Sequence, residues 1–86
     1  MKRGPITHPY RKAKPAAIRS AMAVAGISGA EMHRELERVH GINVSLSTVY
    51  NWMQGVGPGP DERTVKAIAK VVELRDWKRL YNNPPH

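Results

Sequence analysis

Apolar residues recur at helical spacing in four stretches of this chain, with glycines and prolines between them. The first stretch, residues 15–25, places Ile18, Met22 and Ala25 on one face, as in a helix that packs one side against a core. A proline opens the stretch and Gly26 follows it, and these residues are favoured at the start of a helix and just past its end. We therefore expect a first core helix with small apolar side chains.

A second helical stretch begins after Ser28 and runs to about His40. Ser28-Gly-Ala-Glu31 fits the capping box, in which the first and last side chains each bond the other residue's backbone N–H. The N–H groups at such a helix start can also hold a phosphate, which makes Ser28 and Gly29 candidate contacts to DNA phosphates. The inner face of this helix is expected to consist of Met32, Leu36 and Val39.

The stretch from Ser45 to Gly55 differs from the others because its two faces are unlike. Ser45 is a good N-cap and Gly55 a typical helix end, so we expect a helix of about residues 45–54. Its inner face is apolar and consists of Val49, Trp52 and Met53. Its outer face and flanks carry hydrogen-bonding side chains without charge, namely Ser45, Ser47, Thr48, Tyr50, Asn51 and Gln54.

An outer face of this kind suits the edges of DNA bases. The amide of Asn51 or Gln54 can form two hydrogen bonds with adenine in the major groove, and serine or threonine hydroxyls bond either bases or phosphates. An ordinary solvated helix face has a similar composition. The stretch alone therefore leaves both interpretations open.

The link between the second and third helices is short. Gly41 and Asn43 are the residues there that tolerate a left-handed backbone, and Ile42 and Val44 are expected to fill the angle between the two helices. A helix, a short turn and a second helix with a polar outer face make up a helix-turn-helix arrangement.

Residues 43–55, Asn-Val-Ser-Leu-Ser-Thr-Val-Tyr-Asn-Trp-Met-Gln-Gly, resemble part of a known DNA-binding motif. The motif is the second half of the helix-turn-helix of lambda-repressor and Cro-like regulators, commonly Gly-Val-Ser-x-Ser-Thr-Ile-Ser-x-Trp-x-x-Gly. The resemblance extends over about residues 28–74. It implies an all-α domain whose second motif helix enters the major groove, usually in a dimer on a two-fold operator. Residues 40–50 are also similar to helix-turn-helix segments of transposases and recombinases.

The resemblance also implies roles for single positions. It implies that Val44, Val49 and Trp52 are buried. It places the base-reading positions at Ser45, Ser47, Tyr50, Asn51 and Gln54. The chain departs from the usual pattern at two places, because Asn43 stands where a turn glycine is common and Val39 where a small alanine lets the helices approach.

A loop rich in glycine and proline, residues 55–60, leads into a fourth helical stretch. A regular apolar stripe marks this helix, made of Val65, Ile68, Ala69 and Val72. Arg63 and Lys66 lie in its first turns, and they are either contacts to the DNA backbone or simply exposed charges.

The apolar pattern shifts after this stripe, so the helix either bends near Arg75 or restarts at Asp76. The last apolar residues can belong to the core or form an exposed dimer contact, and both interpretations are open. These residues are Trp77, Leu80 and Tyr81.

Basic residues are concentrated at the N-terminus. The chain of 86 residues has 14 Lys and Arg against 7 Asp and Glu, a net charge of +7, and residues 1–20 contain no acid. Prolines interrupt this segment, so we expect residues 1–14 to form a flexible basic arm that lies along phosphates or enters a minor groove. A solubilising tail is the alternative. The candidate contacts of the arm are Lys2, Arg3, Arg11, Lys12 and Lys14.

The composition argues against several other classes of function. A chain this small has little room for a deep catalytic cleft, and it shows no phosphate-binding loop, acid pair or activated serine, so we do not expect an enzyme. No apolar run approaches the length of a membrane span. There is no cysteine, and the histidines are badly spaced for a metal site. We therefore expect no metal, no cofactor and no membrane partner, and a cytoplasmic location on the nucleoid.

These observations predict an all-α, small helix-turn-helix bundle of four to five helices over residues 15–81, followed by a disordered tail at residues 82–86. The expected function is sequence-specific binding of double-stranded DNA by a homodimer, as in a small phage or bacterial repressor. Two alternatives stay open. One is a protein-interaction module on the same scaffold, and the other is the DNA-binding part of a recombination or transposition factor.

Overall fold

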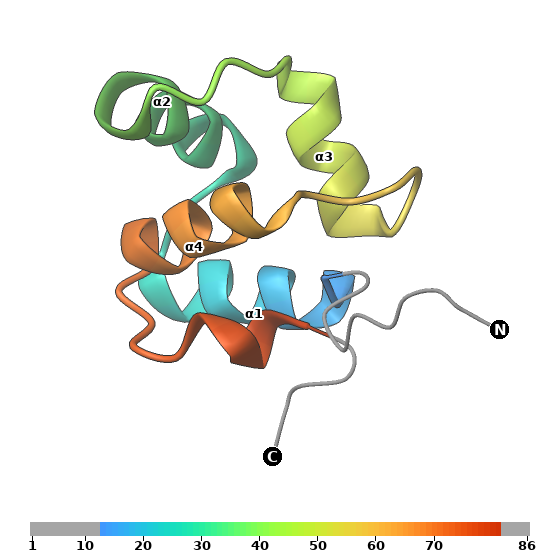
Figure 1. Cartoon of the computed structure of the whole chain (residues 1–86), viewed down its shortest axis with the longest axis vertical. Helices are drawn as coiled ribbons and strands as arrows, with labels where there is room; N and C mark the ends of the chain where they lie inside the picture. The colour runs from blue at the N-terminus through green and yellow to red at the C-terminus, as the bar shows by residue number, and fades with distance from the viewer. Residues whose placement is uncertain (1–12, 82–86) are drawn as a thin grey trace, which may run out of the picture.

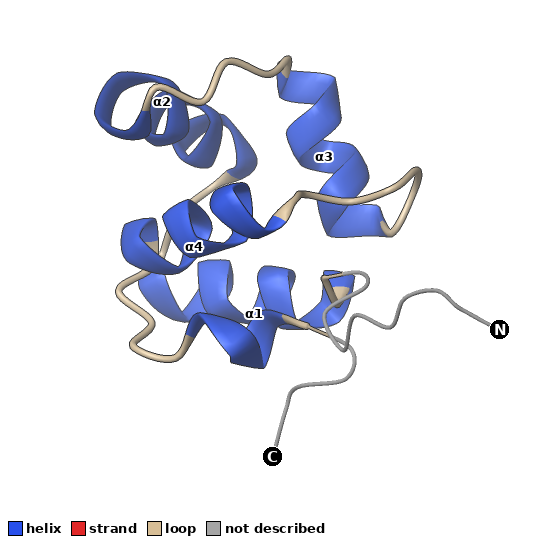
Figure 2. Ribbon diagram, in the orientation of Figure 1, coloured by secondary structure: helices blue, strands red, loops and turns tan. Residues whose placement is uncertain are grey.

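The structure, a computed structural model, describes residues 13–81 as four α-helices and one short 3₁₀-helix (Figure 1). The elements are α1 (Pro15–Ala25), α2 (Gly29–His40), α3 (Leu46–Gln54), α4 (Glu62–Val71) and the 3₁₀-helix η1 (Trp77–Leu80). Residues 13–81 contain no strand, only one isolated antiparallel bridge (Figure 2). The predicted all-α bundle of four to five helices is confirmed.

The boundaries of α2 follow from hydrogen bonds that the sequence predicts. The Glu31 N–H donates to Ser28 Oγ at 3.1 Å, and the Ser28 N–H donates to Glu31 Oε1 at 2.9 Å. Gly41 ends the helix with a left-handed backbone, φ 66°. Asn43, the second candidate for that conformation, does not adopt it, because Gly41 already reverses the chain.

The apolar face of α2 continues into the residues that follow Gly41. The last helical turn of α2 does not contribute to it. Met32 and Leu36 are buried, but Val39 is 56% exposed, so its predicted place in the core is wrong. Ile42 takes that place, because the chain folds back after Gly41 and the Ile42 N–H donates to the Leu36 carbonyl at 2.9 Å.

The end of α1 shows the same kind of difference. Ile18 and Met22 are buried as predicted, whereas Ala25 is exposed. Ala25 is the last residue of the helix, and the chain turns away at Gly26. Ile27 then packs against the core instead.

The packing of the helices leaves α3 at one side of the bundle. α3 contacts α1 and α2, whereas α4 contacts α2 and η1. In Figure 1, α2 and α3 lie at the top, α4 in the middle, and α1 with the red η1 segment at the bottom. The predicted apolar stripe of α4 is buried inside the bundle, at Val65, Ile68, Ala69 and Val72.

The chain after α4 restarts at Asp76 as η1 and does not continue the helix. Leu80 and Tyr81 are 1% and 3% exposed, so both belong to the core and neither can form an exposed dimer contact. Trp77 is half-buried, with its ring edge-on to that of Tyr81 and the ring centroids 5.9 Å apart. The Lys66 ammonium lies 4.9 Å from the centroid of the Trp77 ring.

The N-terminal boundary of the domain lies before the predicted one. Ala13 is buried and forms the isolated bridge with Tyr81, and the Lys14 N–H donates to the Leu80 carbonyl. Ala13 and Lys14 are therefore part of the folded domain and not of a free arm. The rest of the predicted arm and the predicted tail lie outside the described residues. The longest helix within residues 13–81 has 12 residues, and no helix in this range is long and apolar enough to cross a membrane.

Candidate nucleic-acid interface

α3 buries one side and presents the other to solvent. Val49 and Trp52 are 1% and 7% exposed, while Ser47, Asn51 and Gln54 are all exposed. Within residues 13–81 none of these three polar side chains forms a hydrogen bond. No residue of α3 is charged. The outer side of α3 thus offers hydrogen-bond donors and acceptors that a ligand can use.

The first turn of α3 is different, because its hydroxyl groups bond each other. Ser45 Oγ accepts from the Thr48 N–H at 3.1 Å and lies 2.9 Å from Thr48 Oγ1. Ser45 is exposed and Thr48 is half-buried. Both predicted base-reading residues therefore also build the helix cap, which limits how far their hydroxyls can turn toward a base.

Tyr50 projects from α3 across the start of α2. A β-carbon on Gly29 would lie 2.7 Å from Cε1 and 2.8 Å from Cζ of the Tyr50 ring. The ring thus rests on the bare backbone of Gly29, which is itself buried. Tyr50 still keeps 40% of its surface exposed. This predicted base-reading residue therefore also fixes how α3 lies against α2.

The predicted phosphate site at the start of α2 is partly covered by the protein's own side chains, and phosphate binding there stays a prediction. The Ser28 N–H is bonded to the Glu31 carboxylate, and Tyr50 covers Gly29. The hydrogen bond from the Ser28 backbone lowers the pKa of Glu31, so the carboxylate stays charged and repels a phosphate at this place. Ser28 and Gly29 serve here as a helix cap and as the seat of the Tyr50 ring.

A groove of about 430 Å³ separates α3 from the loop that leads to α4. Trp52 and the glycines and prolines of residues 57–60 line it. Thr48 and Asn51 line its α3 side. The Asp61 carboxylate at its other end accepts a hydrogen bond from the Thr64 N–H at 2.9 Å, as the cap of α4. There is therefore room for a ligand group beside Asn51.

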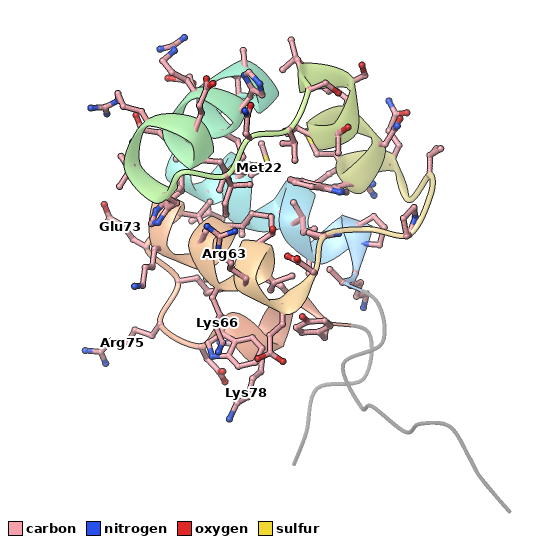
Figure 3. All side chains as sticks on the ribbon, turned by 45° about the horizontal axis from the view of Figure 1, so that its top comes forward. Met22, Arg63, Lys66, Glu73, Arg75 and Lys78 are labelled. Atoms are coloured by element: carbon pink, nitrogen blue, oxygen red, sulfur yellow. The ribbon has the colours of Figure 1, made fainter. Side chains whose placement is uncertain are left out.

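Two predicted phosphate contacts, Arg63 and Lys66, project from α4 (Figure 3). With His40 and Lys70 they line a second groove, of about 310 Å³. Lys66 Nζ lies 3.2 Å from Glu62 Oε2, so its charge is partly neutralised. Arg63 is exposed and forms no hydrogen bond or ion pair within the described part of the chain. The charge of Arg63 acts on the nearby Asp61 carboxylate, but its hydrogen-bond donors are available to a phosphate.

Arg19 contributes a charge that the sequence motifs do not reveal. Its guanidinium donates to the carbonyl of Met53, near the C-terminal end of α3, where the helix dipole favours a cation. The two residues are 34 positions apart, so no periodic pattern within one helix can show the contact. Arg19 is exposed and adds positive charge beside a helix that has none.

The turn before α3 is held by a histidine of α2. His33 Nε2 lies 2.8 Å from the Val44 carbonyl oxygen. A carbonyl can only accept, so the ring nitrogen donates. His33 therefore fixes the backbone two residues ahead of α3. Among the described residues, no group of His, Asp or Glu side chains could hold a metal ion.

The remaining predicted contacts belong to the N-terminal segment. Lys14 is exposed at the start of α1. The other four, Lys2, Arg3, Arg11 and Lys12, lie outside the described residues, so their role stays a prediction.

Comparison of the chain with protein-family models, with curated proteins and with solved structures found no match. The likeness to lambda-repressor and Cro-like regulators therefore rests on the sequence itself, on the motif in residues 43–55 and the order of elements over about residues 28–74.

Proposed function

We propose that this protein binds double-stranded DNA in a sequence-specific way and acts as a small transcriptional regulator, with α3 in the major groove. The observation that carries the proposal is the uncharged outer side of α3, where Ser47, Asn51 and Gln54 are exposed together. Side-chain amides are the groups that form paired hydrogen bonds with adenine. The opposite side of the same helix is buried, so these amides stand on a rigid support.

The charges near α3 suit a partner with a phosphate backbone. Arg19 contacts the end of α3 at the Met53 carbonyl, and Arg63 is exposed on α4, which begins at the groove beside α3. The chain as a whole carries a net charge of +7. Phosphate contacts supply most of the affinity and base contacts the sequence preference. Because α3 itself has no charge, the proposal assigns affinity to the basic residues around it and sequence preference to α3.

The test compares binding to DNA sites selected from a random pool with binding to the pool itself, by fluorescence anisotropy at several salt concentrations. Asn51→Ala should weaken binding to the selected site by about 5- to 150-fold, equal to about 1–3 kcal/mol, and change binding to the pool little. Ser20→Ala, an exposed change on α1, is the matched control and should alter neither. Equal losses on both DNAs would exclude Asn51 from base reading. A failure to select any preferred site would overturn the proposal.

A homodimer on DNA is part of the proposal, because one helix-turn-helix on a single half-site is seldom tight enough alone. A palindromic selected site with a fixed half-site spacing would support it. Because Leu80 and Tyr81 are buried, Trp77 is the one of the three predicted dimer residues that a partner can still contact.

An apolar groove of about 430 Å³ between α1 and the C-terminal segment favours a second candidate, a protein-interaction module. Val24 lines this groove and is 90% exposed. Under this alternative, Val24→Lys abolishes activity in a transcription reporter while Asn51→Ala has no effect. The reverse pattern excludes it. The DNA-binding part of a recombination factor predicts the same Asn51 result as a regulator, and differs in whether the bound site overlaps a promoter.

A further inference from the structure

Leu46, the first residue of α3, is an apolar side chain on an otherwise polar surface. It is 40% exposed. Unlike Val44 and Met53, it belongs neither to the buried core nor to the side chains packed against the core. One turn further along the helix stands Tyr50, also 40% exposed, and residues four apart are neighbours on a helix surface. An apolar strip of Leu46 and Tyr50 therefore runs along one edge of the polar side of α3.

The position of Leu46 sets it apart from a scattered surface leucine. In the sequence it stands between two exposed serines, Ser45 and Ser47, at the end of the helix where acidic side chains are favoured by the dipole. α2 and α4 have such residues in their first turns, Glu31 and Glu62, whereas α3 has none. Leu46 is thus neither part of the core nor a capping residue, and the exposed part of its side chain is available for a partner.

We propose that Leu46 contacts the 5-methyl group of a thymine in the major groove and so determines part of the sequence preference. The proposal rests on the DNA-binding function above. Thymine presents a methyl group at the groove edge, and apolar side chains recognise it by direct contact. The amides of Asn51 and Gln54 bond polar groups and cannot detect a methyl. Leu46 therefore adds a preference for a T·A pair that these amides cannot supply.

The experiment replaces each thymine of the selected site, one at a time, with deoxyuridine. Deoxyuridine keeps the hydrogen-bonding pattern of thymine and lacks only the methyl group. For the wild-type protein, one replacement in each half-site should weaken binding by about fourfold, as expected for one methyl group removed from an apolar contact. With Leu46→Ala, the same replacement should have no further effect, because the carbon atoms that touched the methyl are gone.

Two controls separate this contact from other effects. Leu46→Met keeps an apolar side chain of similar size and should keep most of the deoxyuridine effect. Val39→Ala removes another exposed apolar side chain, on α2, and should leave the effect unchanged. Thermal unfolding of Leu46→Ala should match the wild type, since Leu46 lies outside the core.

The outcomes distinguish this proposal from the proposed function. If a selected site exists but deoxyuridine has no effect at any thymine, or weakens Leu46→Ala as much as the wild type, the role of Leu46 is overturned and DNA binding stands. If no preferred site can be selected, both are overturned. A deoxyuridine effect that disappears in Leu46→Ala and persists in Leu46→Met supports the proposal.

Discussion

Glu73 is the one residue other than glycine within residues 13–81 whose backbone is left-handed, with φ 59°. It follows α4, at the place where the first three helices have a glycine, Gly26, Gly41 and Gly55. A left-handed backbone costs a residue with a β-carbon about 1–2 kcal/mol. Glycine does not pay this cost, although it loses more conformational entropy on folding. The end of α4 is therefore less stable than it could be.

Replacing Glu73 with glycine should raise the free energy of unfolding by about 1 kcal/mol. Gly26→Ala is the matched opposite change, because Gly26 has φ 72° and a β-carbon there would meet nothing within 4 Å. It should lower the free energy of unfolding by a similar amount. Urea denaturation measures both. A loss of stability in Glu73→Gly would show that the Glu73 side chain makes a stabilising contact that outweighs the strain.

At single positions, the periodic pattern was a good guide to the middle of each helix and a poor one to the ends of α1 and α2. Ile18, Met22 and Leu36 are buried as predicted, but Val39 and Ala25 are not. A repeating pattern shows which side of a helix is apolar. It does not show at which residue the helix stops packing against the neighbouring helix.

At the scale of elements, the helix starts were the most predictable features, because caps depend on residues that are close in sequence. The predicted caps Ser28 and Ser45 both form. Asp61 caps α4 in the same way, by accepting a hydrogen bond from the Thr64 N–H at 2.9 Å. Two hydrogen bonds from Thr64 lower the pKa of Asp61. The bond from the Thr64 side chain has the larger effect and the bond from its backbone the smaller one. Since the folded pKa lies below the ordinary value of 3.8, the charged carboxylate stabilises the fold above that value. The contribution is lost as the pH falls through the folded pKa.

This capping carboxylate predicts a pH dependence that Asp61→Asn should reduce. Asparagine caps a helix about as well as aspartate and does not titrate. Between about pH 5 and about pH 2, the free energy of unfolding of the wild type should fall more steeply than that of Asp61→Asn. Urea denaturation at a series of pH values tests this. Parallel curves would mean that Asp61 has the same pKa in the folded and unfolded states.

The candidate site was predictable only in part, because it depends on how the elements pack. The polar outer face of α3 follows from its own sequence, since one helix determines which of its residues lie together. The Tyr50 ring on Gly29 and the Arg19 contact with Met53 join different helices. Sequence spacing holds no information about either contact, nor about how far the Tyr50 ring covers the predicted phosphate site at Ser28 and Gly29.

For the molecule as a whole, the distribution of charge separates the folded domain from the chain ahead of it. Residues 1–12 contain four bases and no acid, so more than half of the net charge of +7 precedes the domain. Under the proposed function, these bases raise affinity for any DNA and leave the choice of sequence to α3.

Changing Arg11 and Lys12 to glutamine should therefore weaken binding to selected and random DNA alike. The slope of log affinity against log salt should decrease by about 0.9 for each phosphate that the variant no longer neutralises. The matched control changes Arg75 and Lys78 to glutamine. Figure 3 shows these two residues at the far end of the molecule from α3. Anisotropy titrations over a range of salt measure both slopes. An equal change in the two variants would show that net charge alone matters and that Arg11 and Lys12 do not contact DNA.

The bridge between Ala13 and Tyr81 places the first and last described residues of the domain side by side. Its points of entry and exit coincide, so a host protein could carry the whole domain as an insertion in one of its surface loops without being stretched. By the same geometry, a short linker could join the two ends and the chain could be reopened in the loop at residues 57–59. The four α-helices would then keep their places while their order along the chain changed.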